Sequence, residues 1–226
     1  MSTSHPRPFN LILLGPPGSG KGTQAQMLAE RFSLYHLSSG DLVRKIINSE
    51  VSGDPFAEAV KARYNQGIPQ PDNIIVELVE KEINRLYRKT GFVFDAFPLS
   101  LPQAIGLERM IKVYEIREPF AISIRVSLQE ALSRLTKRKY CQFDQHVYHP
   151  QDISYKKNIC ELCGQQLITR TDDTPEVVKK RYEAYESRIK ELSGFYSETG
   201  RLLEIDGEQS IQGVFRSVIN ALVPHL

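Results

Sequence analysis

The sequence predicts an α/β protein whose parallel sheet is flanked by helices on both faces. Three observations support this fold class. Short apolar runs are typical of strands buried on both faces, segments with helical spacing alternate with these runs, and a glycine-rich turn separates the first run from the first helix. The chain has 226 residues, of which 41% are hydrophobic and 25% charged, so it can bury a core of its own.

Each element can be justified in order along the chain. The first run, FNLILL, is short and nearly continuous, and it ends at glycine and proline. The expected strands are residues 9–14, 91–95, 120–126 and 202–205. The segments with helical spacing are residues 21–32, 74–87, 102–113, 128–137 and 175–195. Strands that alternate with helices favour a sheet covered on both faces.

Two stretches interrupt this alternation. Residues 41–71 are mostly helical and polar and end in GIPQPD, where two prolines stop a helix. Residues 137–173 are rich in Lys, Tyr, His, Gln and Cys and have little helical periodicity. We expect both to be insertions over the open edge of the sheet. The longer one is a candidate moving lid, because loops beyond about 15 residues are uncommon unless they are functional.

Composition excludes several classes of protein. The 29 Lys and Arg residues against 27 Asp and Glu leave a net charge of +2, too small to attract DNA or an acidic membrane. No apolar stretch approaches the length of a membrane span, and the first residues do not resemble a secretion signal. The 3 cysteines are too few for a disulfide scaffold. We therefore expect a cytoplasmic protein without nucleic-acid or membrane partners.

The turn after the first strand has the spacing of a phosphate-binding loop. It reads GPPGSGKGT, with Lys21 at the start of the expected helix and a hydroxyl at Thr23. Glycines allow backbone N–H groups to approach phosphate oxygens closely. Lys21 is then expected to reach the β- and γ-phosphates of a nucleoside triphosphate, and Thr23 to face Mg²⁺; a chance Gly/Pro turn is the competing interpretation. The expected triphosphate-binding residues are Gly15, Gly18, Ser19, Gly20, Lys21, Gly22 and Thr23.

Three further motifs accompany this loop: HLSSGDLVR at 36–44, GFVFDAFPLSLPQ at 91–103 and RTDD at 170–173. In combination they resemble the adenylate kinase family of nucleoside monophosphate kinases, in its long-lid bacterial form. The resemblance implies a monomer with a P-loop NTPase core, a helical monophosphate-binding insertion and a lid. It also implies reversible, Mg²⁺-dependent transfer of the ATP γ-phosphoryl group to AMP, giving two ADP. The implied core comprises residues 1–38, 71–136 and 174–226, the insertion 39–70 and the lid 137–173.

The resemblance also assigns the AMP site. Ser39 and Arg44 match residues at its phosphate end, where a guanidinium can grip the phosphate with two hydrogen bonds. Gln103 matches the glutamine that reads adenine, since a carboxamide offers a donor and an acceptor together. Gln70 matches a position at which the backbone contacts the same base.

Asp95 matches a carboxylate that holds Mg²⁺ through water. The competing interpretations are a solvated helix arginine at 44 and a turn aspartate at 95.

Phosphoryl transfer depends on cations placed around the transferring group rather than on a general base. Arg134 and Arg138, four residues apart on one helical face, match a family pair at the start of the lid. The resemblance directs Arg134 and Tyr148 to ATP. The residues that it implies for catalysis are Lys21, Arg138, Arg170 and Arg181.

One position departs from the family pattern. The family reads Asp-Gly-Phe-Pro-Arg where this chain has Asp95 to Leu99, so an arginine expected at the AMP phosphate is missing. A charged hydrogen bond contributes about 1.5–3 kcal/mol, and its loss would weaken AMP binding about 10- to 150-fold. Lys45 or Arg63 are alternative cations. The alternative functions are a UMP/CMP kinase, against which Gln103 argues, and a nucleotide-binding paralogue with weak or no transferase activity.

The cysteines lie in the expected lid. Cys160 and Cys163 have the spacing of a metal knuckle, and the order Cys141, Asp144, Cys160, Cys163 resembles the zinc site of some bacterial lids. We expect a structural Zn²⁺ with these four ligands. His146 and His149 are rival fourth ligands, and a metal-free lid is the alternative.

Overall fold

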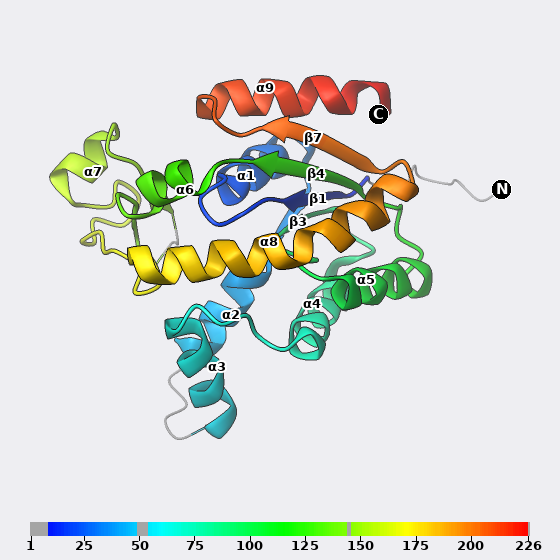
Figure 1. Cartoon of the computed structure of the whole chain (residues 1–226), viewed down its shortest axis with the longest axis horizontal. Helices are drawn as coiled ribbons and strands as arrows, with labels where there is room; N and C mark the ends of the chain where they lie inside the picture. The colour runs from blue at the N-terminus through cyan, green and yellow to red at the C-terminus, as the bar shows by residue number, and fades with distance from the viewer. Residues whose placement is uncertain (1–8, 49–53, 144–145, 226) are drawn as a thin grey trace.

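The computed structural model describes residues 9–48, 54–143 and 146–225. In this part of the chain, five strands form one sheet in which all neighbours are parallel (Figure 1). Their order across the sheet is β2 (Tyr35–Ser38), β3 (Phe92–Asp95), β1 (Leu11–Leu14), β4 (Phe120–Arg125) and β7 (Leu202–Asp206). The predicted fold class is confirmed.

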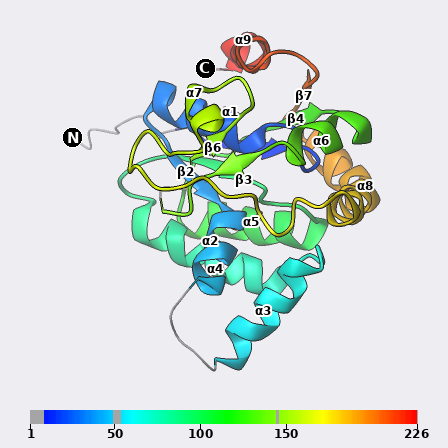
Figure 2. The ribbon, with the colours of Figure 1, turned by 90° about the vertical axis from the view of Figure 1, so that its left-hand side faces the viewer.

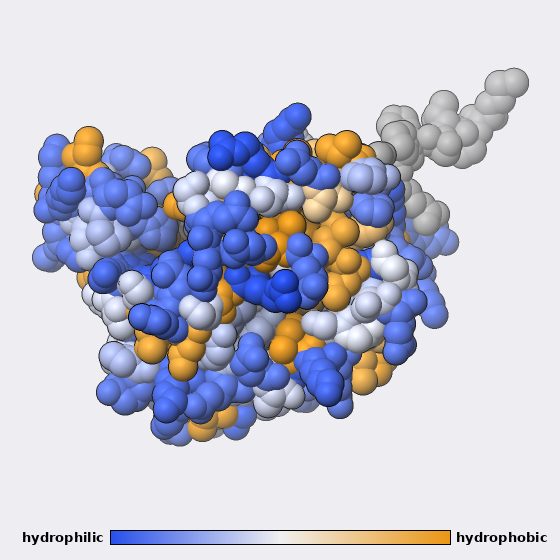
Figure 3. All heavy atoms as spheres, turned by 45° about the horizontal axis from the view of Figure 1, so that its top comes forward, coloured by the Kyte–Doolittle hydropathy of each residue, from blue (hydrophilic) through white to orange (hydrophobic). Residues whose placement is uncertain are grey.

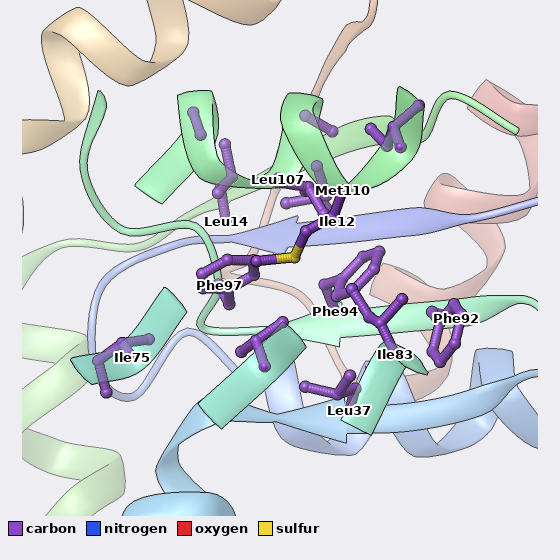
Figure 4. Close-up of a cluster of buried hydrophobic side chains, with 14 of the residues drawn as sticks. Ile12, Leu14, Leu37, Ile75, Ile83, Phe92, Phe94, Phe97, Leu107 and Met110 are labelled. Atoms are coloured by element: carbon purple, nitrogen blue, oxygen red, sulfur yellow. The ribbon is translucent and has the colours of Figure 1, made fainter. Parts of the chain in front are cut away.

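The central strands are mostly apolar, as expected where helices cover both faces of the sheet. Ile12 and Phe94 pack on the face covered by α4, α5 and α8 (Figure 4). Leu13 and Val93 pack on the opposite face, against α1 and α9. These helices are α1 (Lys21–Phe32), α4 (Asp72–Leu86), α5 (Leu101–Val113), α8 (Pro175–Glu198) and α9 (Ile211–Leu222). Consecutive side chains of a strand point to opposite faces, so both must be apolar.

The four predicted strands and five predicted helices are present, with ends that differ from the expected ones by at most three residues. β2 and α9 were not predicted. β2 pairs only with β3, and its sequence YHLS alternates polar and apolar residues instead of forming an apolar run. α9 contains Gly213 and several β-branched residues, which weaken helix propensity. Its buried Val214, Val218 and Leu222 do recur at helical spacing.

The two interrupting stretches project from the core on the side where the strands end (Figure 1). The first contains α2 (Ser39–Ile47) and α3 (Pro55–Asn65). The second follows α6 (Leu128–Leu135) and lies nearest the viewer in Figure 2. It contains the antiparallel pair β5 (Lys139–Tyr140) and β6 (Val147–Tyr148) and the short α7 (Ile153–Lys157). These elements are too short to give a sequence signal.

On the face shown in Figure 3, apolar residues form groups among polar ones. None of the helices in the described part of the chain is long and apolar enough to cross a membrane.

Candidate nucleotide-binding site

The phosphate loop connects the end of β1 to the start of α1. Gly18 and Gly20 have φ values of 80° and 87°, which glycine adopts readily. A Cβ atom at Gly18 would lie 2.9 Å from the backbone of Ala131 in α6, so only glycine fits there. Among the described residues, no side chain caps α1 at Gly20. The first N–H groups of α1 therefore remain available to an anion.

Lys21 lies inside this loop. Its Nζ donates to the carbonyl oxygens of Gly15 at 2.7 Å and Pro16 at 2.8 Å. Burial lowers the pKa of Lys21 to about 8, although the charge of Asp95 acts to raise it. The electrostatic attraction between this buried ammonium group and a phosphate is strong, because it acts at low dielectric.

Asp95 ends β3 beside the loop. Its Oδ2 lies 3.2 Å from His36 Nε2 and 3.4 Å from the position of a Cβ atom on Gly22, in the first turn of α1. Burial acts to raise the pKa of Asp95, but the hydrogen bond from His36 and the charges of His36 and Lys21 lower it overall. The structure thus brings an ionised carboxylate to the first helical turn. A carboxylate in this position is suited to hold Mg²⁺ through a coordinated water molecule.

The two aspartates of RTDD hold two of the predicted arginines. Arg138 donates from Nε and Nη2 to the Asp173 carboxylate at 2.9 and 2.7 Å, and Asp173 is fully buried. Arg181 Nη1 donates to Asp172 Oδ2 at 2.6 Å. The sequence analysis used these aspartates only as a motif. Their role here is to fix both guanidinium groups in place.

The other two predicted arginines have different surroundings. Arg134 donates to the carbonyl oxygens of Gly207 at 2.8 Å and Gly18 at 3.4 Å, so it connects the phosphate loop to the segment after β7. Arg170 lies over the ring of Tyr140, and its buried Nε has no partner among the described residues. Burial lowers the pKa of Arg170 to about 10, and the charges of Arg138 and Arg44 act in the same direction. Such repulsion between cations is relieved when an anion binds among them.

A cavity of about 220 Å³ extends from the phosphate loop between α2 and α8. It brings together Lys21 and the four residues predicted for AMP, which are Ser39, Arg44, Gln70 and Gln103. Arg44 forms an ion pair with Asp41 and also contacts Tyr64. The Tyr64 hydroxyl in turn donates to Asp172 Oδ1 at 3.1 Å, so these contacts link α2 to the RTDD segment. The cavity therefore has a cationic end near Lys21 and a carboxamide at Gln103.

Position 99 lies on the wall of this cavity, and the Leu99 N–H donates to Gln103 Oε1 at 2.8 Å. The alternative cations named from the sequence do not line it: Lys45 is exposed, and Arg63 donates to the Pro69 carbonyl. Arg188 does line it, on the face of α8 that also carries Arg181. The sequence analysis missed Arg188. The spacing of seven residues between the two arginines, which places them on one helical face, was the available signal.

Tyr148 lies outside the cavity lining. It is 1% exposed inside the lid, and its hydroxyl lies 3.2 Å from Cys160 Sγ. The neighbouring His149 is near enough to the arginine pair for their charges to affect its pKa. Burial lowers the pKa of His149, and Arg138 and Arg134 act in the same direction, whereas Asp152 raises it. The ATP contact expected of Tyr148 stays a prediction.

The three cysteines meet in the lid. Their Sγ atoms all lie within 4.8 Å of one another, and those of Cys141 and Cys163 are 3.4 Å apart. Cys141 and Cys160 are buried, and Cys163 is exposed. Asp144, the expected fourth ligand, lies outside the described residues. Thiol groups this close together fit the ligand set of a tetrahedral zinc site.

Fold and site together define a P-loop nucleotide-binding protein with a cavity that extends from its phosphate loop. A family model described as adenylate kinase matches residues 13–201. The adenylate kinase of Carboxydothermus hydrogenoformans is 36% identical over 215 residues, which cover 95% of this chain and 99% of that protein. The adenylate kinases of Clostridium tetani (35%, covering 95% and 98%) and Archaeoglobus fulgidus (33%, covering 93% and 96%) are also similar. The chain belongs to the adenylate kinase family.

Proposed function

We propose that this protein is an adenylate kinase that transfers the γ-phosphoryl group of ATP to AMP and produces two ADP. The observation that carries the proposal is the cavity in which Lys21, Arg44 and Gln103 meet. It joins a phosphate loop for the donor to a pocket with a cationic end and a carboxamide for the acceptor. Family membership supports the same reaction.

In the proposed reaction, a phosphate oxygen of AMP attacks the γ-phosphorus and the bond to the β,γ-bridging oxygen breaks. The chain contributes position and charge. Lys21 binds the β- and γ-phosphates, Arg44 holds the AMP phosphate, and Arg138 and Arg181 stabilise the charge on the transferring group. Asp172 and Asp173 hold the last two guanidinium groups in fixed orientations, which reduces the reorganisation that these groups need before transfer.

Mg²⁺ bound with ATP would neutralise charge on the β- and γ-oxygens. Within this chain, Thr23 in the first turn of α1 and Asp95 beside it are the groups suited to hold the ion, the carboxylate through water. The lowered pKa of Asp95 keeps it ionised at neutral pH, which this role requires.

Leu99 favours one competing function, a nucleotide-binding paralogue with weak transferase activity. Two features argue for an active enzyme. Arg181 and Arg188 line the same cavity as Arg44, so the acceptor pocket has cations besides Arg44. The donor side has its full set of phosphate-loop residues. We therefore propose that the missing arginine affects AMP affinity more than it affects the reaction itself.

We further propose that residues 39–70 and 137–173 act as separate units that cover the acceptor and the donor. In the second unit, Cys141, Cys160 and Cys163 would hold a structural Zn²⁺ with a fourth ligand from Asp144, His146 or His149. Among the described residues of this unit, the buried cluster consists of Tyr148, Leu167 and two of the cysteines, with the partly buried Tyr155 packed against it. So small a core needs a metal or other cross-link to stay folded.

The experiment that tests the proposed function is an ADP-forming assay with Lys21→Met. The variant should lose more than nine-tenths of the wild-type kcat, because it removes a charged contact to the transferring group. Lys45→Met is the matched control, since Lys45 is exposed and outside the cavity lining, and it should keep wild-type activity. Equal activity of both variants would contradict the proposed role of the loop.

A further inference from the structure

The side chain of Gln103 is held at both of its polar atoms. Its Oε1 accepts from the Leu99 N–H at 2.8 Å, and its Nε2 donates to Asp72 Oδ1 at 2.7 Å. Gln103 is only 3% exposed and still lines the cavity. The carboxamide therefore faces the acceptor pocket from a fixed position.

These two partners permit a single orientation of the carboxamide. A backbone N–H can only donate and a carboxylate can only accept, so a flipped Gln103 would oppose donor to donor and acceptor to acceptor. Each Gln103 atom keeps one further bonding site, since the NH₂ group has a second hydrogen and the oxygen a second lone pair. The side chain can thus offer the pocket a donor and an acceptor whose order is fixed.

We infer that Asp72 is a positioning residue that sets the base specificity of the acceptor pocket. The inference rests on the proposed function and names the group that makes it selective. An adenine ring presents an N6 donor beside the N1 acceptor, whereas a 6-oxopurine presents an O6 acceptor beside an N1–H donor. A carboxamide whose donor and acceptor are fixed in order can form both hydrogen bonds with one of these base edges. Against the other edge it places donor against donor and acceptor against acceptor. With Asp72 and the Leu99 N–H in place, Gln103 selects the 6-aminopurine.

Asp72 is itself held at a junction of helices. It is the first residue of α4, where the helix dipole favours a negative charge, and Gln103 lies in the first turn of the neighbouring α5. Arg188 Nη1 lies 4.0 Å from Asp72 Oδ1, so a cation from α8 faces the same carboxylate atom. Three helices therefore meet at the group that orients Gln103. A role confined to starting α4 would not require the contact with Gln103.

The test compares AMP with IMP, which differ only at the N6/O6 and N1 groups. Asp72→Asn keeps the shape of the side chain, but its amide can donate or accept, so of the two partners only the Leu99 N–H still opposes a flip of Gln103. We expect the ratio of kcat/KM for AMP to that for IMP to fall at least about tenfold, with the value for IMP rising, as a good hydrogen-bonded pair discriminates by this much. The KM for ATP should not change.

Glu77→Gln is the matched control. It makes the same charge change on α4, at an exposed residue paired with Lys81, and should leave the AMP/IMP ratio at the wild-type value. If Asp72→Asn does not fold, Asp72→Ser carries the same expectation with a residue that is common at helix starts. An unchanged ratio in an active, folded variant would overturn the inference alone. A wild-type protein that transfers to neither nucleotide would overturn the proposed function and this inference with it.

Discussion

Raising the pH should stabilise the ligand-free protein through Lys21. Burial lowers the pKa of this lysine from 10.5 to about 8 in the folded state. Between these values the unfolded chain binds more protons than the folded chain, so the free energy of unfolding rises with pH. A shift of this size contributes about 2 kcal/mol between about pH 7 and about pH 9.5. Below about pH 7 the free energy of unfolding no longer changes with pH through Lys21, because this lysine is protonated in both states.

The assay is urea unfolding of the wild type and of Lys21→Met at both pH values. Other groups that titrate in this range change both proteins alike, so the difference between them isolates Lys21. The wild type should gain about 2 kcal/mol relative to Lys21→Met on going to the higher pH. Lys45→Met, in which an exposed lysine is lost, should keep the wild-type pH dependence. Parallel pH profiles for the wild type and Lys21→Met would refute the argument.

The same lysine links proton uptake to nucleotide binding. A triphosphate prefers the charged ammonium, so binding above about pH 8 requires the uptake of a proton. The Kd for ATP should then rise by up to tenfold per pH unit between about pH 8 and pH 10 in the wild type. It should rise much less in Lys21→Met.

Two further predictions concern the acceptor pocket and the lid. Leu99→Arg should raise kcat/KM for AMP about 10- to 100-fold, as one charged hydrogen bond allows, and leave the KM for ATP unchanged. Steady-state kinetics that show no gain in kcat/KM for AMP would contradict the role assigned to position 99. The protein purified without chelator should contain one zinc per chain by elemental analysis. Cys163→Ser should lose the metal and lower Tm, whereas Leu162→Ser, at an exposed residue between Cys160 and Cys163, should keep it. Well under half an equivalent of zinc in the wild type would contradict the proposed site.

The fold could be predicted where burial leaves a pattern in the sequence. β1, β3 and β4 pair with strands on both sides and are covered by helices, so they read as apolar runs. β2 lies at the edge of the sheet, and its His36 contacts Asp95 instead of filling a core. The lid hairpin has two residues in each strand, which is too few to show a period. The sequence therefore predicted the centre of the sheet better than the edge formed by β2 and the elements within residues 137–173.

The site could be predicted where function depends on a local motif. The phosphate loop acts through spacing within nine residues, which a sequence displays directly. Asp72 and Arg188 lie far apart in the chain and acquire a role only when α4 and α8 are packed around Gln103. Leu99 shows both cases. Its departure from the family pattern was visible in the sequence, whereas the hydrogen bond from its N–H to Gln103 required the structure.

The most direct test of the account is the choice of acceptor. Transfer from Mg²⁺-ATP to AMP, UMP and CMP should be measured for the wild type under the same conditions by formation of nucleoside diphosphate. We predict that AMP gives the highest kcat/KM and that two ADP form for each ATP consumed. A higher kcat/KM for UMP or CMP than for AMP would contradict the account. A protein that transfers to none of the three nucleotides would also contradict it.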